Sequence, residues 1–384
     1  MNKNEGSIVV SHFALRCAQL AFGVLITLLL VKQVFAFEAI EPSPGTRAMG
    51  MAGVFAPQAD DSTAIWYNPA GPKHGHGVRQ EVSAELTDAA ALEIPMAGGA
   101  VSGFDKGETS LRFVGAYRAG IDPDDKQATG FGLAYLRLYD AAVYVDAPRS
   151  LLDSTPYGRV ESVYHQISAA LNRSVSHRFT VGASLDVLWT EISCLDFSPC
   201  VDNGPNGFGG SVGALFDIIK TEERAVTASA MWRSGADLSY DSLPSSGVGT
   251  VLENFLPDRP ETLSIGVSVK QPLSWAHLRG NVVYEMRDWS GAASSDAPLS
   301  DYSGWGVSGE MMSAPQIGRT LALRLGLKQM QADDAGDDVK VLAVGVGYGF
   351  GGRHAVDAAV ERRDGGGAAQ QENTAWSVSY SIQF

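Results

Sequence analysis

The strongest constraint on the fold is a strict alternation of apolar and polar residues, which recurs from about residue 78 to the C-terminus. Between residues 179 and 189, for example, Phe, Val, Ala, Leu, Val and Trp occupy the odd positions, whereas Thr, Gly, Ser and Asp occupy positions 180 to 186 between them. An alternation of period two places the two classes on opposite faces of a β-strand. The pattern therefore predicts an all-β protein.

Fourteen segments carry this pattern. In chain order they are Val78–Leu86, Ser110–Arg118, Gly130–Tyr139, Arg159–Arg173, Arg178–Thr190, Gly207–Ile218, Ala225–Tyr240, Glu261–Lys270, Ala276–Arg287, Tyr302–Met312, Arg319–Gln329, Lys340–Gly349, His354–Arg363 and Ala375–Phe384. A further stretch, Glu93–Ser102, contains Pro95 and is assigned to a loop, because proline cannot donate a hydrogen bond within a sheet. With that assignment, long and short connections alternate along the chain.

An even number of antiparallel strands with long loops at one end and short turns at the other is typical of outer-membrane proteins. We therefore expect a 14-stranded antiparallel transmembrane β-barrel. A soluble sandwich or lipocalin-like barrel is the alternative, but fourteen strands would leave a lumen too wide for side chains to fill. The aromatic C-terminal residue, Phe384, looks like the signal read by the barrel-insertion machinery.

The start of the chain predicts export. An apolar run, Leu20–Val31, follows Lys3 and Arg16 and is shorter than the roughly 20 residues of a spanning helix. We expect a signal peptide over residues 1–36, with a retained anchor as the alternative, and a Gram-negative outer-membrane location. The net charge of -14 argues against a nucleic-acid partner.

Between the signal and the first strand lies a stretch rich in glycine and turn-forming residues, Gly45–Gly71. Trp66 and Tyr67 provide two large aromatic anchors immediately before Asn68 and Pro69, which favour a turn. A flexible linker is the alternative. Because a wide lumen must be blocked, we predict that residues 37–77 form a hatch inside a barrel of residues 78–384, with Trp66, Tyr67, Asn68, Pro69 and Ala70 as its hatch and gating residues.

Two cysteines of the exported part, Cys194 and Cys200, are close enough in sequence to form a disulfide loop. Two free thiols are the alternative. No metal site is expected, because no further cysteine or nearby histidine completes a tetrahedral set. The aspartates of the loop around residues 333–338 are interpreted as exposed, and whether they bind calcium stays open.

The chain resembles the FadL family of outer-membrane transporters for hydrophobic compounds, which includes long-chain fatty-acid and aromatic-hydrocarbon channels. The segment Asn68-Pro69-Ala70 is similar to the NPA segment of the family's hatch. Three barrel stretches are also similar, namely Ile167–Trp189, Leu256–Val269 and Val282–Ser290. The resemblance implies passive uptake without a cofactor or catalysis, by a monomer whose partners are a hydrophobic ligand and membrane lipid.

The resemblance also implies capture by extracellular loops, gating by the hatch and lateral exit at a kink in the third strand. On this chain Gly130 and Gly132 are the candidates for that lateral opening. The capture-loop candidates are apolar residues spaced along one face of a short amphipathic helix, namely Val248, Val251, Leu252, Phe255 and Leu256.

Two other functions stay open: a hatch-bearing barrel that serves as a protein-secretion shuttle or anchor, and a general porin for polar solutes. An enzyme is not expected, because the histidines lack an evident nucleophile. The lining should discriminate between the functions. A transporter predicts a continuous apolar pocket beneath the hatch, a shuttle predicts an exposed apolar rim, and a porin predicts an open charged channel.

Overall fold

A computed structural model describes residues 43–71, 80–88, 91–92, 109–118, 129–145, 158–195, 206–221, 224–236, 259–288, 301–314, 318–332, 338–365 and 371–383. Two single-turn helices, α2 (Thr46–Met49) and α3 (Ala64–Tyr67), precede the strands. Within the described residues, no helix is long and apolar enough to cross a membrane. The predicted signal peptide and the aromatic terminal residue Phe384 lie outside these residues.

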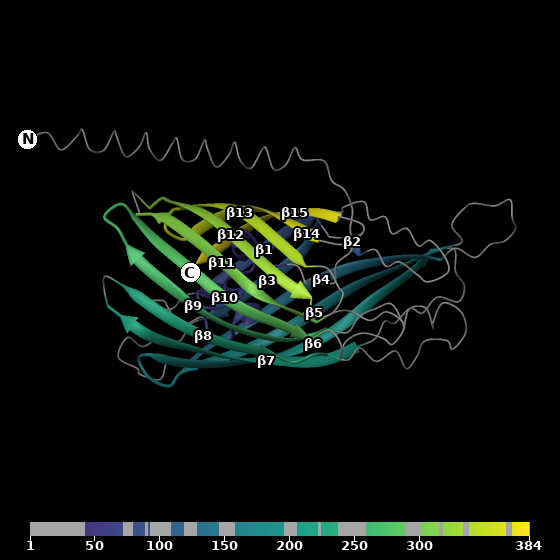
Figure 1. Cartoon of the computed structure of the whole chain (residues 1–384), viewed down its shortest axis with the longest axis horizontal. Helices are drawn as coiled ribbons and strands as arrows, with labels where there is room; N and C mark the ends of the chain where they lie inside the picture. The colour runs from purple at the N-terminus through teal and green to yellow at the C-terminus, as the bar shows by residue number, and fades with distance from the viewer. Residues whose placement is uncertain are drawn as a thin grey trace, which may run out of the picture.

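After residue 71 most of the described chain is β-sheet (Figure 1). The strands are β1 (Gln80–Asp88), β2 (Ala91–Leu92), β3 (Thr109–Arg118), β4 (Thr129–Val145), β5 (Gly158–Ser174), β6 (Phe179–Leu195), β7 (Asn206–Lys220), β8 (Ala225–Arg233), β9 (Glu261–Pro272), β10 (Ala276–Asp288), β11 (Tyr302–Ser313), β12 (Thr320–Ala332), β13 (Val339–Phe350), β14 (His354–Gly365) and β15 (Gln371–Gln383). The prediction of an all-β protein is confirmed, and every predicted strand range overlaps one of these strands.

Two boundaries differ from the prediction. The strand expected over Ala225–Tyr240 ends at Arg233, because Gly235 follows and the chain then makes an isolated bridge between Ala236 and Arg259. In the other direction, β4 continues to Val145, beyond the alternating segment that predicted it. The stretch Glu93–Ser102 lies outside the described residues.

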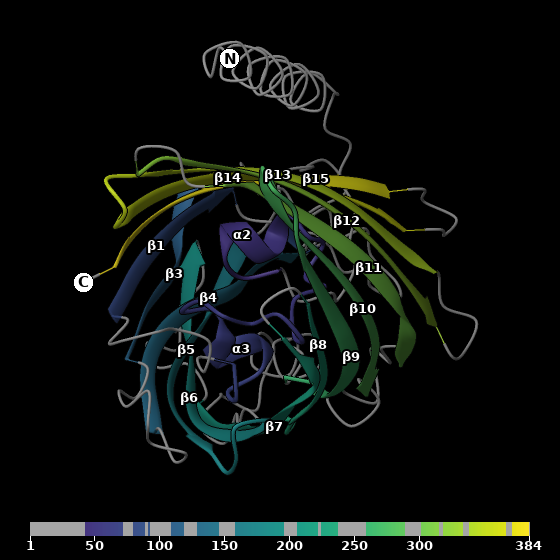
Figure 2. The same cartoon turned by 90° about the vertical axis from the view of Figure 1, so that its left-hand side faces the viewer.

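All strands belong to one sheet, and neighbours in the chain pair antiparallel from β3 through β15. The first strand, β1, pairs antiparallel with both β3 and β15. The two-residue β2 pairs parallel with β4. The strands surround α2 and α3, which lie inside the curve of the sheet (Figure 2).

The sheet is apolar outside and polar inside, as the alternation predicts for a membrane barrel. Leu185, Ile265 and Leu327 on the outer face are 76%, 47% and 48% exposed, whereas Asp186 and Ser264 on the inner face are 3% and 2% exposed. Large apolar side chains in water would be costly, at about 25 cal/mol per Å². The outer face therefore requires an apolar environment.

Candidate functional site: the N-terminal segment and its contacts with the sheet

Residues 43–71, here called the N-terminal segment, lie inside the curve of the sheet (Figure 2). Nearly every residue of the segment is buried. Its path depends on left-handed backbone at Gly45 and Gly53, with φ of 85° and 70°. At its end, the Asn68 side chain accepts a hydrogen bond from the Ala70 amide at 3.0 Å and so forms a local turn.

The predicted hatch residues contact several strands. Asn68 Nδ2 donates to the carbonyl oxygens of Ala214 and Ala230, at 3.3 and 3.4 Å. The Trp66 carbonyl accepts a hydrogen bond from Arg233 Nη2 at 2.7 Å, and the Arg233 guanidinium lies 3.5 Å from the centre of the Trp66 ring. The last turn of the segment is therefore held by strands β7 and β8.

Inward-facing glycines allow the sheet to approach the segment. At six positions, a Cβ atom would stand closer than 3.0 Å to an atom of the N-terminal segment, which real Cβ atoms essentially never do. We call this set the glycine collar, and it consists of Gly132, Gly182, Gly213, Gly266, Gly306 and Gly326 on β4, β6, β7, β9, β11 and β12. At these six positions there is no room for even a methyl group between the sheet and the N-terminal segment.

Ion pairs fix the other side of the segment. Arg47 Nη1 lies 2.7 Å from Asp60, and Arg47 Nη2 lies 2.8 Å from Glu310 of β11. Arg279 of β10 lies 2.5 Å from Asp60, and Arg324 of β12 lies 2.8 Å from Glu310. These side chains form a cluster that joins the segment to three strands.

The pKa of each charged side chain in this cluster depends on the charges of its neighbours, because the cluster is removed from water. Burial alone would lower the pKa of Arg47, but Asp60, Glu310 and Asp61 more than offset this and hold the pKa well above its ordinary value. Burial raises the pKa of Asp61, and the nearby Arg47 and the hydrogen bonds from Thr63 oppose that rise. Removing one partner of such a pair leaves a buried charge, which typically costs about 3–5 kcal/mol.

Beside β3 to β6 the segment makes apolar contacts, together with a hydrogen bond from the Tyr117 hydroxyl to the Asp60 carbonyl at 3.2 Å. A continuous cluster of buried side chains begins in the segment and continues into the wall. Its members include Phe55, Ile65, Trp66 and Tyr67 of the segment and Phe113, Leu136, Leu138, Tyr164 and Leu188 of the wall. Ionic and apolar contacts occur on both sides of the enclosed space. Arg259 pairs with Asp186 of β6 at 2.7 Å, and Val54 belongs to a second buried cluster with Val283 of β10 and Met330 of β12.

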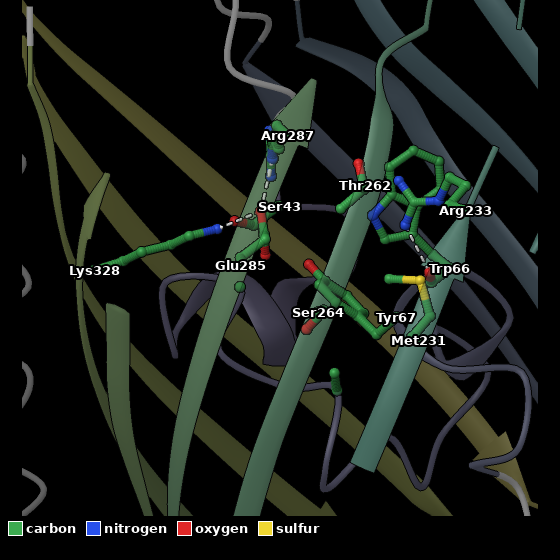
Figure 3. Close-up of a pocket in the computed structure, with 12 residues that line it drawn as sticks. Ser43, Trp66, Tyr67, Met231, Arg233, Thr262, Ser264, Glu285, Arg287 and Lys328 are labelled. Atoms are coloured by element: carbon green, nitrogen blue, oxygen red, sulfur yellow. Dashed lines mark hydrogen bonds and ion pairs between the residues drawn. The ribbon is translucent and has the colours of Figure 1, made fainter. Parts of the chain in front are cut away.

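Two cavities adjoin the segment. One, of 20 Å³, is lined by Trp66, Arg233 and the pair of Glu285 with Lys328 (Figure 3). This volume is about that of one water molecule. The other, of 370 Å³, lies by the short turns and is lined by the ionic cluster and by residues such as Thr320 and Ala322.

Neither cavity is the continuous apolar pocket that a transporter predicts. The small one is too small for an organic ligand, and charged side chains line much of the large one. The apolar side chains of the enclosed space are instead packed against one another in the cluster.

The strand predicted for a lateral opening is irregular, at a different position from the predicted glycines. Gly130 and Gly132 pair regularly with β5, and Gly132 belongs to the glycine collar. Ladder pairs with β3 end at Leu136, those with β2 begin at Asp140, and the register with β5 shifts between Arg137 and Asp140. We call residues 137–139, which pair with neither β3 nor β2 in the described ladders, the β3–β4 break.

The remaining predicted site residues are not tested by this arrangement. The capture-loop residues from Val248 to Leu256 and the cysteine Cys200 lie outside the described residues. Cys194 lies in β6, opposite Val160 of β5. In the part of the chain that is described, no group of three or more His, Cys, Asp or Glu residues is arranged to hold a metal ion.

No protein-family model matches the chain, and no curated protein sequence matches it. Solved structures do. The toluene transporter TbuX of Ralstonia pickettii has a TM-score of 0.56 and 15% identity, covering 89% of this chain and 99% of its own. A FadL homologue of Pseudomonas aeruginosa has a TM-score of 0.54 and 13% identity, covering 90% and 99%.

The toluene transporter TodX of Pseudomonas putida has a TM-score of 0.51 and 14% identity, covering 92% of this chain and 99% of its own. At such identities the likeness is one of fold. The resemblance to FadL-like outer-membrane transporters is therefore confirmed for the architecture of nearly the whole chain.

Proposed function

We propose that this protein is an outer-membrane channel for passive uptake of hydrophobic small molecules. The observation that carries the proposal is the buried apolar cluster, which leads from Trp66 and Tyr67 to Leu136 and Leu138 beside the β3–β4 break. The solved structures of similar fold are named as toluene transporters and as a FadL homologue, which supports a transport role rather than an enzyme.

The architecture we propose is a closed barrel of fourteen strands in the outer membrane of a Gram-negative bacterium. The pairing of β1 with β15 and of β4 with both β3 and β5 supports closure. Aromatic side chains gather on the outer face at both ends of the strands, as in Tyr284 with Trp305 and Tyr348 with Phe350. Such girdles are typical of the two membrane interfaces.

Within this barrel, residues 37–77 act as the hatch, after removal of a signal peptide over residues 1–36. The glycine collar and the ionic cluster support a tightly held plug instead of an open pore. An open charged porin is disfavoured because the N-terminal segment contacts six strands through the glycine collar. No described feature favours a secretion shuttle.

The proposed route has three steps. The loop containing Val248–Leu256 captures the ligand, which then enters by displacing side chains around Trp66 and Tyr67. It leaves sideways into the membrane at the β3–β4 break. The described cavity beside Trp66 has a volume of 20 Å³, which is too small for an organic ligand, and this supports gating by movement.

Uptake of labelled toluene and of a labelled fatty acid, by cells with and without the protein, tests the proposal. We expect the protein to accelerate uptake of at least one ligand class without admitting a labelled disaccharide, because the segment blocks polar solutes. If cells with and without the protein take up toluene at the same rate, and also take up the fatty acid at the same rate, a transport role is contradicted. Entry of the disaccharide would instead favour a porin.

A further inference from the structure

Strands β8 and β9 continue as a short ribbon beyond their ladder, and the tip of this ribbon turns into the interior. The ladder reaches Arg233, and two backbone hydrogen bonds between Ala236 and Arg259, at 3.0 and 3.1 Å, then extend it in the same register. Because Arg233 faces inward, alternation would place Ala236 on the outer face of the sheet. Ala236 is instead 3% exposed and belongs to the buried apolar cluster beside the N-terminal segment. We call residues 234–236 and 259–260 the ribbon tip.

The contacts of the Arg259 side chain show how far the ribbon tip crosses the interior. Its Nη1 lies 2.7 Å from Asp186 of β6 and donates to Gln166 Oε1 of β5 at 2.8 Å. Along the sheet β9 is three strands away from β6, which is about 14 Å at a spacing of about 4.8 Å. This distance exceeds the length of an arginine side chain, so the tip leans inward over β7. Gly209 of β7 leaves the space for it, because a Cβ atom there would overlap Arg259 Nη2.

Arg259 joins the ribbon tip to the wall formed by β5 and β6. Besides its bonds to that wall, its Nη2 donates to the Ser234 carbonyl at 3.1 Å, and the Ser234 hydroxyl accepts a hydrogen bond from the Gly210 amide at 3.0 Å. The side chains of Arg259 and Asp186 are 1% and 3% exposed. Separating two buried charges without a new partner for either is costly. The pair therefore acts as a latch.

The ribbon tip lies next to the predicted hatch residues, at the end of the sheet where β8 leads into the connection 234–260. Arg233, just before the tip, contacts the carbonyl and the ring of Trp66 (Figure 3). Ala236 of the tip shares the buried cluster with Tyr164 and Leu188. The tip thus covers part of the apolar cluster from the side of the long connections.

We propose that the ribbon tip is an entrance lid and that Arg259 is its positioning residue, which holds the lid shut through Asp186 and Gln166. This inference rests on the proposed function, in which the ligand arrives from the end of the long connections. Opening breaks the bonds from Arg259 to β5 and β6 and moves Ala236 out of the apolar cluster, which then becomes accessible to the ligand. Lid opening often limits the overall rate, so a weaker latch speeds entry.

The first measurement follows the lid directly. Ala236→Cys places a thiol in the ribbon tip, and its reaction with a membrane-impermeant maleimide in whole cells reports how often the tip is open. The same chain without this substitution corrects for labelling of Cys194 and Cys200.

The latch variant combines Arg259→Gln with Asp186→Asn, which removes both charges so that neither is left buried alone. The matched control combines Lys220→Gln with Asp217→Asn, which removes an ion pair from the other end of β7. Heat-dependent mobility in detergent gels verifies that each variant is folded. The second measurement is uptake of labelled toluene and of a labelled fatty acid by the same cells.

We expect the new thiol to react about tenfold faster in the latch variant than in the parent background, the effect of losing one hydrogen bond to a charged group. Uptake of the transported ligand should rise by a similar factor, and the control variant should change neither quantity. A residue that merely braces the fold would lower uptake when it is replaced.

Three outcomes would overturn the inference. Equal labelling of the latch variant and the parent would show that Arg259 does not hold the ribbon tip. Faster labelling with unchanged or lower uptake, in a protein that does transport, would show that the tip opens away from the ligand's path, and the proposed function would stand. If no chain accelerates uptake of either ligand over cells without the protein, the proposed function fails, and the tip has no role as an entrance lid.

Discussion

At the scale of single residues, the contacts of the N-terminal segment depend on the absence of side chains at the collar positions of the sheet. Each glycine of the collar faces backbone or side-chain atoms of the segment where a methyl group would overlap them. Glycine weakens a strand, because it loses more conformational freedom on folding and offers no side chain to pack. Glycine at these six positions therefore weakens the strands but allows them to contact the segment closely.

Substitution in the collar should therefore destabilise the protein. In Gly182→Ala the added Cβ meets the backbone of Pro69, which cannot move aside as a flexible side chain would. We expect a loss of about 1–3 kcal/mol, the usual effect of overpacking a filled core, measured as a lower unfolding temperature in heat-dependent gel mobility.

Gly280→Ala is the matched control, because nothing lies nearer than 3.9 Å to a Cβ at that position of β10. It should be neutral or slightly stabilising, since alanine is less flexible in the unfolded chain. Equal destabilisation by the two substitutions would show that strand propensity matters and that contact with the segment does not.

At the scale of elements, β4 differs most from a regular strand. It pairs with three other strands, β2, β3 and β5, and its register shifts between Arg137 and Asp140. Bulges are common beside functional sites, because they redirect side chains and end a ladder. The position of the break next to the apolar cluster is the basis for placing lateral exit there.

Removing the irregularity should stop transport without unfolding the protein. Deletion of Tyr139 removes the one extra residue of β4, because Arg137 pairs with His165 and Asp140 pairs with Val163, and the later residues of β4 then keep their partners and faces. We expect uptake of hydrophobic ligands to fall to the background level, with heat-dependent gel mobility like that of the parent protein.

A deletion of one residue in the connection 146–157 is the control and should leave uptake unchanged. Full uptake by the variant that lacks Tyr139 would place the exit elsewhere.

The strands and their faces could be predicted from the sequence, because alternation is a local property. The bulge at Arg112 of β3, where the register with β1 shifts, could not, since one inserted residue reverses the face of its neighbours without a signal in the alternation. The ionic cluster was also missed, because Arg47 and Glu310 are 263 residues apart. The collar did leave a signal, which is glycine on the polar face of many strands.

At the scale of the whole molecule, the segment and the sheet share one interior. Ion pairs join the segment to β10, β11 and β12, apolar side chains join it to β3 to β6 and also to β10 and β12, and the collar contacts it on six strands. The fold of the sheet was predictable from the sequence, whereas these contacts of the interior were not, because they join residues far apart in the chain.

Removal of residues 43–71 should open the interior to ions. We expect a large increase in the single-channel conductance of planar bilayers, because the segment occupies the space within the sheet. It should also lower the unfolding temperature, since the collar glycines would face water. The control is a chain cut to begin at residue 37, which keeps the segment. Equal conductance of both chains would mean that the segment does not block the lumen.

The glycine collar also bears on the order of assembly. Residues 43–71 precede β1 in the chain, and β1 pairs with β15, the last strand. A sheet that had already joined β1 to β15 would have to reopen to admit a segment that fits with no space for a methyl group. We therefore expect the segment to act as an internal template, around which the strands are laid down before their first and last members meet.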